Sequence, residues 1–284
     1  MVATSEQDGE ARLTTFKALV ESHANSIAED LERGQRSKRT KWPEQDALIE
    51  YARIEVGAQR SFMRATSSAR LGTLVLDEFY EPTSRSPRFK QPYADLIATM
   101  LAARAEANGR AYLNDIEGTH IAAALERTGK ELLSAGFPGF AEQAFDQAAC
   151  IHARFRDKQS EDRCQYLRLE AHRRTYPQWH PMRFAWGVSR WLIGYGYKPM
   201  RMLVWIAVVI TGFAVYLLQL PRDPGATRGD ALFVTLQNFV NPVGLGSAKS
   251  MSRTWEAPLE VESYTGDVLR NVFFVLLIRR WFRL

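Results

Sequence analysis

Two cysteines and two histidines near the middle of the sequence are residue types that bind zinc. They are Cys150, His152, Cys164 and His172. Structural zinc sites usually bring paired ligands together on turns, whereas this part of the chain is predicted to be helical. On a helix, residues two apart such as Cys150 and His152 point in different directions. The spacing therefore predicts no metal site, and the sequence predicts no cofactor.

Catalytic motifs are also missing from the sequence. His120, three residues after Glu117, has the spacing of helical metal ligands, but it is a single pair beside a glycine. Phosphate loops, nucleophile elbows and paired carboxylates are absent from the sequence. The two cysteines fall in a part predicted below to be cytoplasmic, so we expect free thiols rather than a disulfide. We therefore predict that the protein is not an enzyme.

The element that organises the chain is a run of nineteen residues without a charged side chain, from Met202 to Leu220. As a helix this run covers roughly 28 Å, close to the hydrocarbon thickness of a bilayer. Pro199 and Pro221 flank it, as expected at helix ends. We predict a membrane span over residues 202–220. The alternative is a helix buried on all sides in a large soluble protein.

Basic residues crowd against this span, in a chain of net charge +5 and pI near 9.2. By the positive-inside rule, this flank and the N-terminal part are cytoplasmic, and the placement favours membrane lipid over nucleic acid as the partner. A cleavable signal peptide is not recognisable, so we expect the span itself to direct insertion. Residues 173–201 contain six basic residues and no acidic one: Arg173, Arg174, Arg183, Arg190, Lys198 and Arg201.

Residues 1–81 form a predicted N-terminal helical region. Residues 9–33 carry apolar side chains at steps of three and four, which predicts one amphipathic helix, and a second is expected from Thr40 to about Ser67. The apolar stripe of the first helix packs within its own domain or against another subunit. The five basic residues within residues 33–41 predict an exposed connector or a site for phosphate or anionic lipid. Residues 71–80 fit a strand or a helical turn.

Residues 92–175 form a second predicted cytoplasmic domain, after a proline-rich linker. Around Gly136 to Gly139, small residues alternate with aromatic ones on two successive helices, a pattern that resembles the hairpin of tetratricopeptide-like repeats. A generic antiparallel bundle is the alternative. Either arrangement offers a groove to a cytoplasmic protein partner or a neighbouring subunit. Helices are expected over residues 93–108, 119–135, 138–154 and 160–174.

Residues 179–284 form the predicted membrane domain. Residues 182–195 predict a helix that lies along the inner leaflet. A second span is predicted over residues 268–284, which returns the C-terminal arginines to the cytoplasm, although its uncharged run, residues 271–278, is short. Residues typical of the membrane interface flank the two spans: Trp179, Trp186, Trp191, Tyr195, Arg279 and Arg280.

The segment between the spans has a pattern of its own. Residues 230–239 read Asp-Ala-Leu-Phe-Val-Thr-Leu-Gln-Asn-Phe, and residues 243–246 read Val-Gly-Leu-Gly. With its flanking spans, the segment 230–246 resembles the pore helix and filter of the ion-channel family that includes bacterial potassium channels. The resemblance implies a re-entrant segment and assembly of a homo-oligomer around a central axis. It also implies these pore-like residues: Thr235, Asn238, Asn241, Val243, Gly244, Leu245 and Gly246.

The filter-like segment lacks the threonine and tyrosine residues that hold the filter in the family. Asn241-Pro242 stands where paired threonines are expected, and Leu245 replaces a tyrosine. In the family, the threonine and tyrosine side chains anchor the rings of carbonyls that select potassium. This chain lacks both, so the resemblance does not extend to potassium selectivity.

Together these features predict an all-α protein with a helical cytoplasmic domain, followed by a membrane unit of two helices and a re-entrant pore-like segment. We expect a channel-like oligomer of the bacterial inner membrane, with both termini cytoplasmic. Its cytoplasmic helices would serve sensing or assembly, and a role as a membrane-disrupting effector is one hypothesis. The alternatives are a non-conducting, membrane-tethered scaffold that recruits a partner protein, and a true cation channel.

Overall fold

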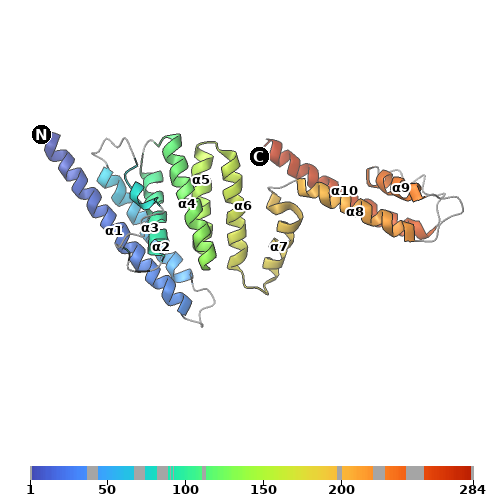
Figure 1. The fold of residues 1–284 in the computed structure, drawn as a ribbon, viewed down its shortest axis with the longest axis horizontal. Coiled ribbons are helices and arrows are strands. Elements are labelled where there is room, and N and C mark those ends of the chain that lie inside the picture. Colours follow the sequence, from blue (N-terminus) through green and yellow to red (C-terminus); the bar gives the residue numbers. More distant parts are fainter. Residues whose placement is uncertain are drawn as a thin grey trace. The chain divides into compact units, whose positions relative to one another are not determined.

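All regular structure in the described part of the chain is helical (Figure 1). The computed structural model describes residues 2–36, 44–66, 74–81, 89, 91, 93–110, 113–196, 200–219, 228–240 and 253–282. The prediction of an all-α fold is confirmed for these residues. The proline-rich linker, most of the basic connector and the filter-like residues 241–246 lie outside them.

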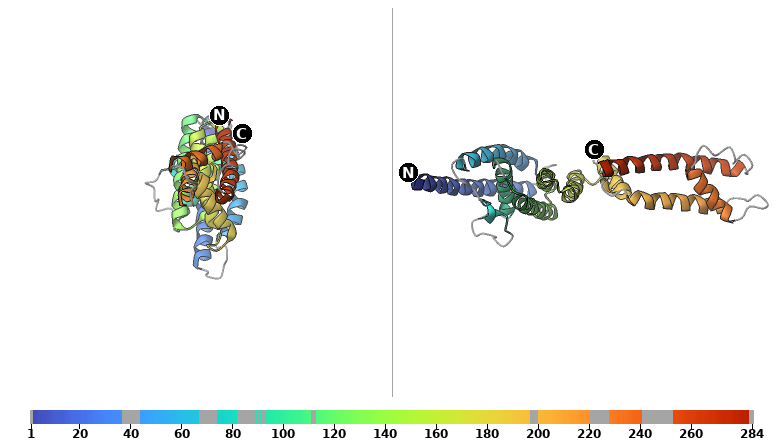
Figure 2. Two further views of the ribbon diagram at one scale, coloured as in Figure 1. Left: turned by 90° about the vertical axis from the view of Figure 1, so that its right-hand side faces the viewer. Right: turned by 90° about the horizontal axis from the view of Figure 1, so that it is seen from above.

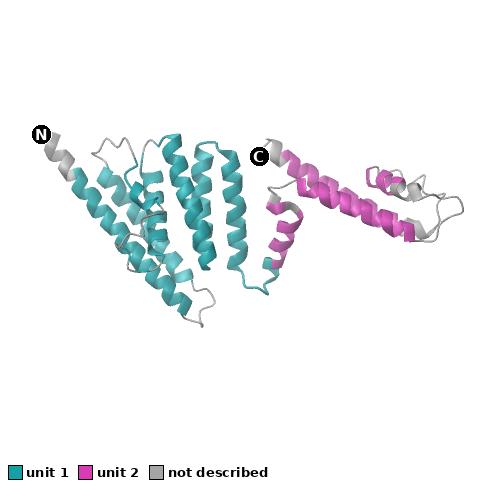
Figure 3. Cartoon of the chain, viewed as in Figure 1, with its two compact units in different colours: residues 1–183 teal, residues 184–284 magenta. Residues whose placement is uncertain are grey.

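The chain divides into two compact units, Met1–Arg183 and Phe184–Leu284 (Figure 3). The predicted regions 1–81 and 92–175 both fall within the first unit. In this unit α1, α2 and α3 pack against one another, and α3, α4, α5 and α6 then pack each against the next (Figure 1). Its elements are α1 (Val2–Arg36), α2 (Gln45–Thr66), the 3₁₀ turn η1 (Asp77–Phe79), α3 (Ala94–Gly109), α4 (Asp115–Ala135), α5 (Pro138–Arg154) and α6 (Lys158–Thr175).

Packing inside the first unit accounts for the apolar stripe of α1. Phe16, Val20 and Leu31 are buried in one core with residues of α2 and α3. The rings of Phe16 and Phe62 meet edge to face, with centroids 5.3 Å apart. This burial corresponds to the first of the two alternatives for the stripe, packing within its own domain.

The turn between α4 and α5 is set by local backbone chemistry. Gly136 follows α4 in the left-handed region, with φ of 90°, which suits a residue without a Cβ. The N–H groups of Gly136 and Phe137 both donate to the carbonyl of Leu132, so the end of α4 is capped. Pro138 then opens α5, where its missing N–H costs little. The chain therefore reverses in two residues, and α5 packs against α4.

A buried carboxylate holds the segment around η1 on α3. Glu106 accepts hydrogen bonds from the backbone N–H groups of Val75 and Leu76, at 2.7 and 3.3 Å, and from the Tyr80 hydroxyl at 2.9 Å. Residues 74–80 therefore contain a 3₁₀ turn that is anchored by side-chain bonds, and not a strand.

The second unit contains most of α7 (Pro181–Ile193), which begins at the end of the first unit, and then η2 (Gly194–Gly196), α8 (Met200–Gln219), α9 (Arg228–Val240) and α10 (Arg253–Phe282). Helices α8 and α10 lie side by side in both Figure 1 and Figure 2. The shorter α9 packs against both of them. This arrangement places a short helix against a hairpin of two long ones.

Glu44 caps α5 from a distant point in the sequence. Its carboxylate accepts hydrogen bonds from the N–H groups of Gly139 and Phe140, at 2.8 and 3.2 Å, in the first turn of α5. Burial raises the pKa of Glu44 from its ordinary value of 4.5 to about 7, although these two hydrogen bonds act in the opposite direction. The protonated carboxyl is therefore favoured in the folded state over a wider pH range than in the unfolded state.

This shift predicts a pH dependence of stability. Because the folded state binds the Glu44 proton more tightly, the contribution of this group is complete below about pH 4.5 and is lost as pH rises towards 7. Glu44→Gln should flatten the unfolding free energy over that range in denaturant titrations of the detergent-solubilised chain. Glu131→Gln, on the exposed face of α4, is the control. Equal pH profiles for wild type and Glu44→Gln would contradict the assignment.

Candidate functional site

Helix α8 presents apolar side chains outward along its length. Val204, Val208 and Val215 are 62, 51 and 49% exposed, and α8 buries only Met202, Ala214 and Leu217. A core helix of a soluble protein would bury such residues. Among the described residues, α8 is the one helix that is long and apolar enough to cross a membrane. The predicted span over 202–220 corresponds to this helix, and the predicted second span over 268–284 stays a prediction.

A polar contact is buried between α9 and α10. The Asn238 side-chain amide donates to the Leu259 carbonyl at 2.7 Å and to Glu262 Oε2 at 3.2 Å. Glu262 is fully buried, and its Oε1 has no hydrogen-bond partner among the described residues. A buried carboxylate is costly without such partners. The Asn238 amide therefore stabilises Glu262 and ties the two helices together.

The same face of α10 holds the C-terminal end of α9. The Arg270 guanidinium donates to the Val240 carbonyl at 2.9 Å and pairs with Asp267 one turn earlier. Helix C-termini leave carbonyls without intrahelical partners, and a cation there is favourable. Arg270 and Asp267 thus make their contacts within the second unit.

Small and polar residues complete the α9 and α10 interface. A Cβ on Gly266 would lie 2.9 Å from the Phe239 ring, so this ring packs directly on the backbone of α10. Thr235, one turn before Asn238 on α9, is fully buried. The structure therefore buries the two described pore-like residues, Thr235 and Asn238, and brings Asn238 to Glu262.

The sequence patterns did not identify Glu262 as a site residue. The available signal was helical spacing: Leu259, Glu262, Gly266 and Arg270 recur at steps of three and four. The structure places this series on the face of α10 that meets α9. The filter-like residues Asn241, Val243, Gly244, Leu245 and Gly246 lie outside the described part of the chain.

The predicted interface residues lie on different elements. The Trp191 and Trp205 rings join α7 to α8, with centroids 3.9 Å apart, and Trp186 lies 6.0 Å from Tyr195. Trp179, in the first unit, is 96% exposed. Arg279 and Arg280 belong to α10, but their side chains are outside the described part. Trp191 is 63% exposed beside the apolar helix α8, as is typical of a membrane interface.

The four cysteines and histidines considered above as zinc ligands do not form one site. Cys150 is exposed and His152 is buried on the opposite side of α5, as their spacing predicts. His172 Nδ1 instead lies 3.0 Å from a carboxylate oxygen of Glu142, and His120 Nε2 lies 3.2 Å from Asp77 Oδ1. His152 and Cys164 do approach each other, together with Glu126 of α4.

No family model, curated protein or solved structure matches this chain. The likeness to ion-channel pore units therefore stays an expectation that depends on the residues quoted above.

The buried contact predicts an asymmetric mutational effect. Asn238→Leu leaves the Glu262 carboxyl buried without its donor and should lower the unfolding free energy by about 2 kcal/mol. The double variant Asn238→Leu/Glu262→Leu removes both polar partners and should be more stable than Asn238→Leu alone. Thermal unfolding in detergent measures both effects, and Tyr264→Leu, at a 75% exposed position of α10, is the control. A neutral Asn238→Leu would show that the contact contributes nothing.

Proposed function

We propose that this chain is an integral membrane protein whose C-terminal unit forms a two-span, channel-like element with a re-entrant segment between the spans. Its N-terminal unit is a cytoplasmic helical domain for assembly or partner binding. The observation that carries this proposal is the buried contact between Asn238 of α9 and Glu262 of α10, in a unit whose α8 is suited to a bilayer.

The continuity of α10 supports a second span despite the short apolar run in the sequence. Its 30 residues cover about 45 Å as a helix, longer than the bilayer core is thick. Towards its C-terminal end Phe274 and Val275 are 52 and 64% exposed, as lipid-facing residues would be. Polar groups at membrane depth must be satisfied by protein or by water in a cavity. Asp267 and Arg270 meet that requirement through their contacts within the unit, and Glu262 meets it at one of its two carboxylate oxygens.

A buried carboxylate in a membrane unit is a functional feature by default, because an ionisable group there is costly. In a symmetric oligomer, each copy contributes one Glu262, and a ring of carboxylates favours cations over anions. We therefore propose that the assembled unit passes cations, with Glu262 as the group that attracts them and Asn238 as the residue that positions it.

The departures in the filter-like segment favour a second candidate function. Without the paired threonines and the tyrosine, the carbonyl rings that conduct potassium lose their supports. On that basis the membrane unit is a non-conducting anchor, and the N-terminal helices recruit a protein partner.

Ion flux from proteoliposomes that contain the purified full chain distinguishes these functions. The channel-like proposal predicts cation flux that falls several-fold in Glu262→Gln, which removes the charge and keeps the shape of the side chain. Tyr264→Phe, on an exposed position of the same helix, should leave the flux unchanged. An absence of flux from reconstituted, folded oligomer would contradict conduction and favour the anchor.

A further inference from the structure

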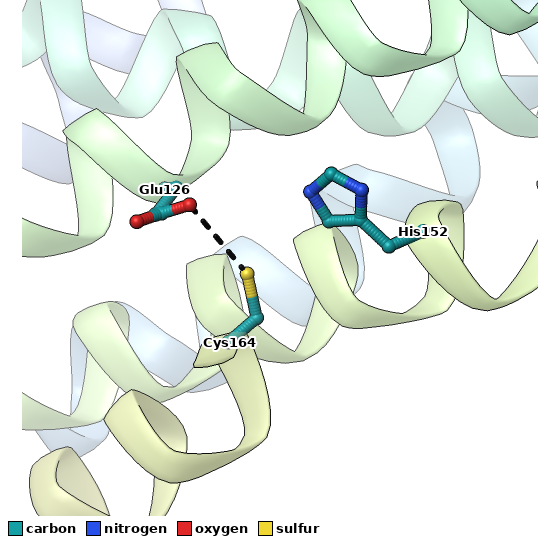
Figure 4. Close-up of side chains that lie close together, drawn as sticks. All are labelled: Glu126, His152 and Cys164. Atoms are coloured by element: carbon teal, nitrogen blue, oxygen red, sulfur yellow. Dashed lines mark hydrogen bonds between the residues drawn. The ribbon is translucent and has the colours of Figure 1, made fainter. Parts of the chain in front are cut away.

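Three chemically distinct ligand groups converge inside the first unit. Glu126 of α4, His152 of α5 and Cys164 of α6 are all buried, and one potential ligand atom from each lies within 4.8 Å of the other two (Figure 4). They come from three successive helices, so helix packing brings together residues that are far apart in sequence. A thiol, an imidazole and a carboxylate are the ligand types that zinc uses in proteins.

The imidazole of His152 is oriented as a ligand. His152 is 3% exposed, and its Nε2 has no hydrogen-bond partner among the described residues. In Figure 4 this nitrogen points towards Glu126 and Cys164. On the other side of the ring, Asp157 Oδ2 lies 3.4 Å from Nδ1. A carboxylate beside one ring nitrogen of a histidine, which leaves the other nitrogen free to bind, is the usual second shell of a metal site.

The buried thiol is not suited to nucleophilic catalysis. Cys164 is fully buried and donates to Glu126 Oε2 at 3.9 Å. Burial, together with the nearby Glu126, raises the pKa of the Cys164 thiol to about 12. A nucleophilic cysteine needs a lowered pKa and access to substrate, and this residue has neither. Metal binding remains as the chemistry that these three groups share.

Two partly exposed cations pair with Glu126. Lys130 Nζ lies 2.7 Å from Oε1, and the Arg163 guanidinium lies 2.6 Å from Oε2. The side chains of Lys130 and Arg163 are 57 and 54% exposed, so both can move into solvent. A divalent ion would therefore replace two surface cations beside a carboxylate that is already in position.

We propose that Glu126, His152 and Cys164 bind one Zn²⁺ ion, which cross-links α4, α5 and α6. The Cys164 thiol gives its proton to solvent as the metal–sulfur bond forms, and the fourth coordination position is open to water. The softness of the thiolate and the imidazole selects zinc or cobalt over magnesium or calcium. This site is independent of the function proposed for the membrane unit.

Cobalt provides a direct spectroscopic test on the full chain in detergent. Addition of Co²⁺ should produce a thiolate-to-cobalt charge-transfer band at one equivalent, and Zn²⁺ should remove it by competition. Cys164→Ser should abolish the band. The matched control is Cys150→Ser, which removes the exposed thiol of α5 and should keep the band. A band that survives Cys164→Ser, or that disappears in Cys150→Ser, overturns the site.

Two further variants separate metal binding from a merely structural polar cluster, and they keep the native thiol. Arg163→Gln removes a competing cation and should tighten Co²⁺ binding several-fold. Asp157→Asn should weaken it about 10-fold, because it removes the carboxylate beside Nδ1. Zn²⁺ should also raise the unfolding temperature of the wild type. Failure of the folded wild type to bind Co²⁺, or unchanged affinity in both variants, would leave only a packing role and would overturn the proposal.

Discussion

The hydrogen bond from Asn238 to Glu262 constrains how α9 packs against α10 in the C-terminal unit. A buried carboxylate requires a donor, and the observed register of α9 against α10 supplies one. A one-residue shift of α10 would turn Glu262 away from Asn238 and would separate the Phe239 ring from Gly266. The same register brings Arg270 to the last carbonyl of α9. The polar contact and the apolar contact therefore specify the same packing.

The two units differ in the side chains that they turn outward. In the first unit the aromatic and aliphatic residues gather in a core, as Tyr51, Phe62 and Phe140 do with almost no exposure. In the second unit α8 and α10 expose valines and phenylalanines, while the contact of Glu262 with Asn238 is buried. The buried apolar core of the first unit is typical of a protein in water. The exposed apolar side chains of the second unit are typical of a protein in lipid. The proposed boundary between cytoplasm and membrane follows this change.

Local patterns were sufficient to predict most of the helices, but not the first half of α10, residues 253–267. The apolar run and its flanking prolines gave α8, and Gly136 with Pro138 gave the turn between α4 and α5, because such signals depend on neighbouring residues. Contacts between helices were not predictable in this way. The sequence spacing of Cys150 and His152 correctly placed them on different sides of α5, but nothing local indicated that His152 would meet Glu126 and Cys164. Glu262 was missed for the same reason, since its partner is 24 residues away.

The two-span arrangement requires that the C-terminus lie on the cytoplasmic side of the membrane, which a topology measurement tests directly. A reporter that is active only in the periplasm, fused after Leu284, should be silent if α10 returns the chain to the cytoplasm. In the same cells, Ser247→Cys should react with a membrane-impermeant thiol reagent added from outside, since residue 247 lies between the two proposed spans. Strong reporter activity, or a Ser247→Cys thiol that reacts only after the cells are opened, would contradict the two-span arrangement and the channel-like function that depends on it.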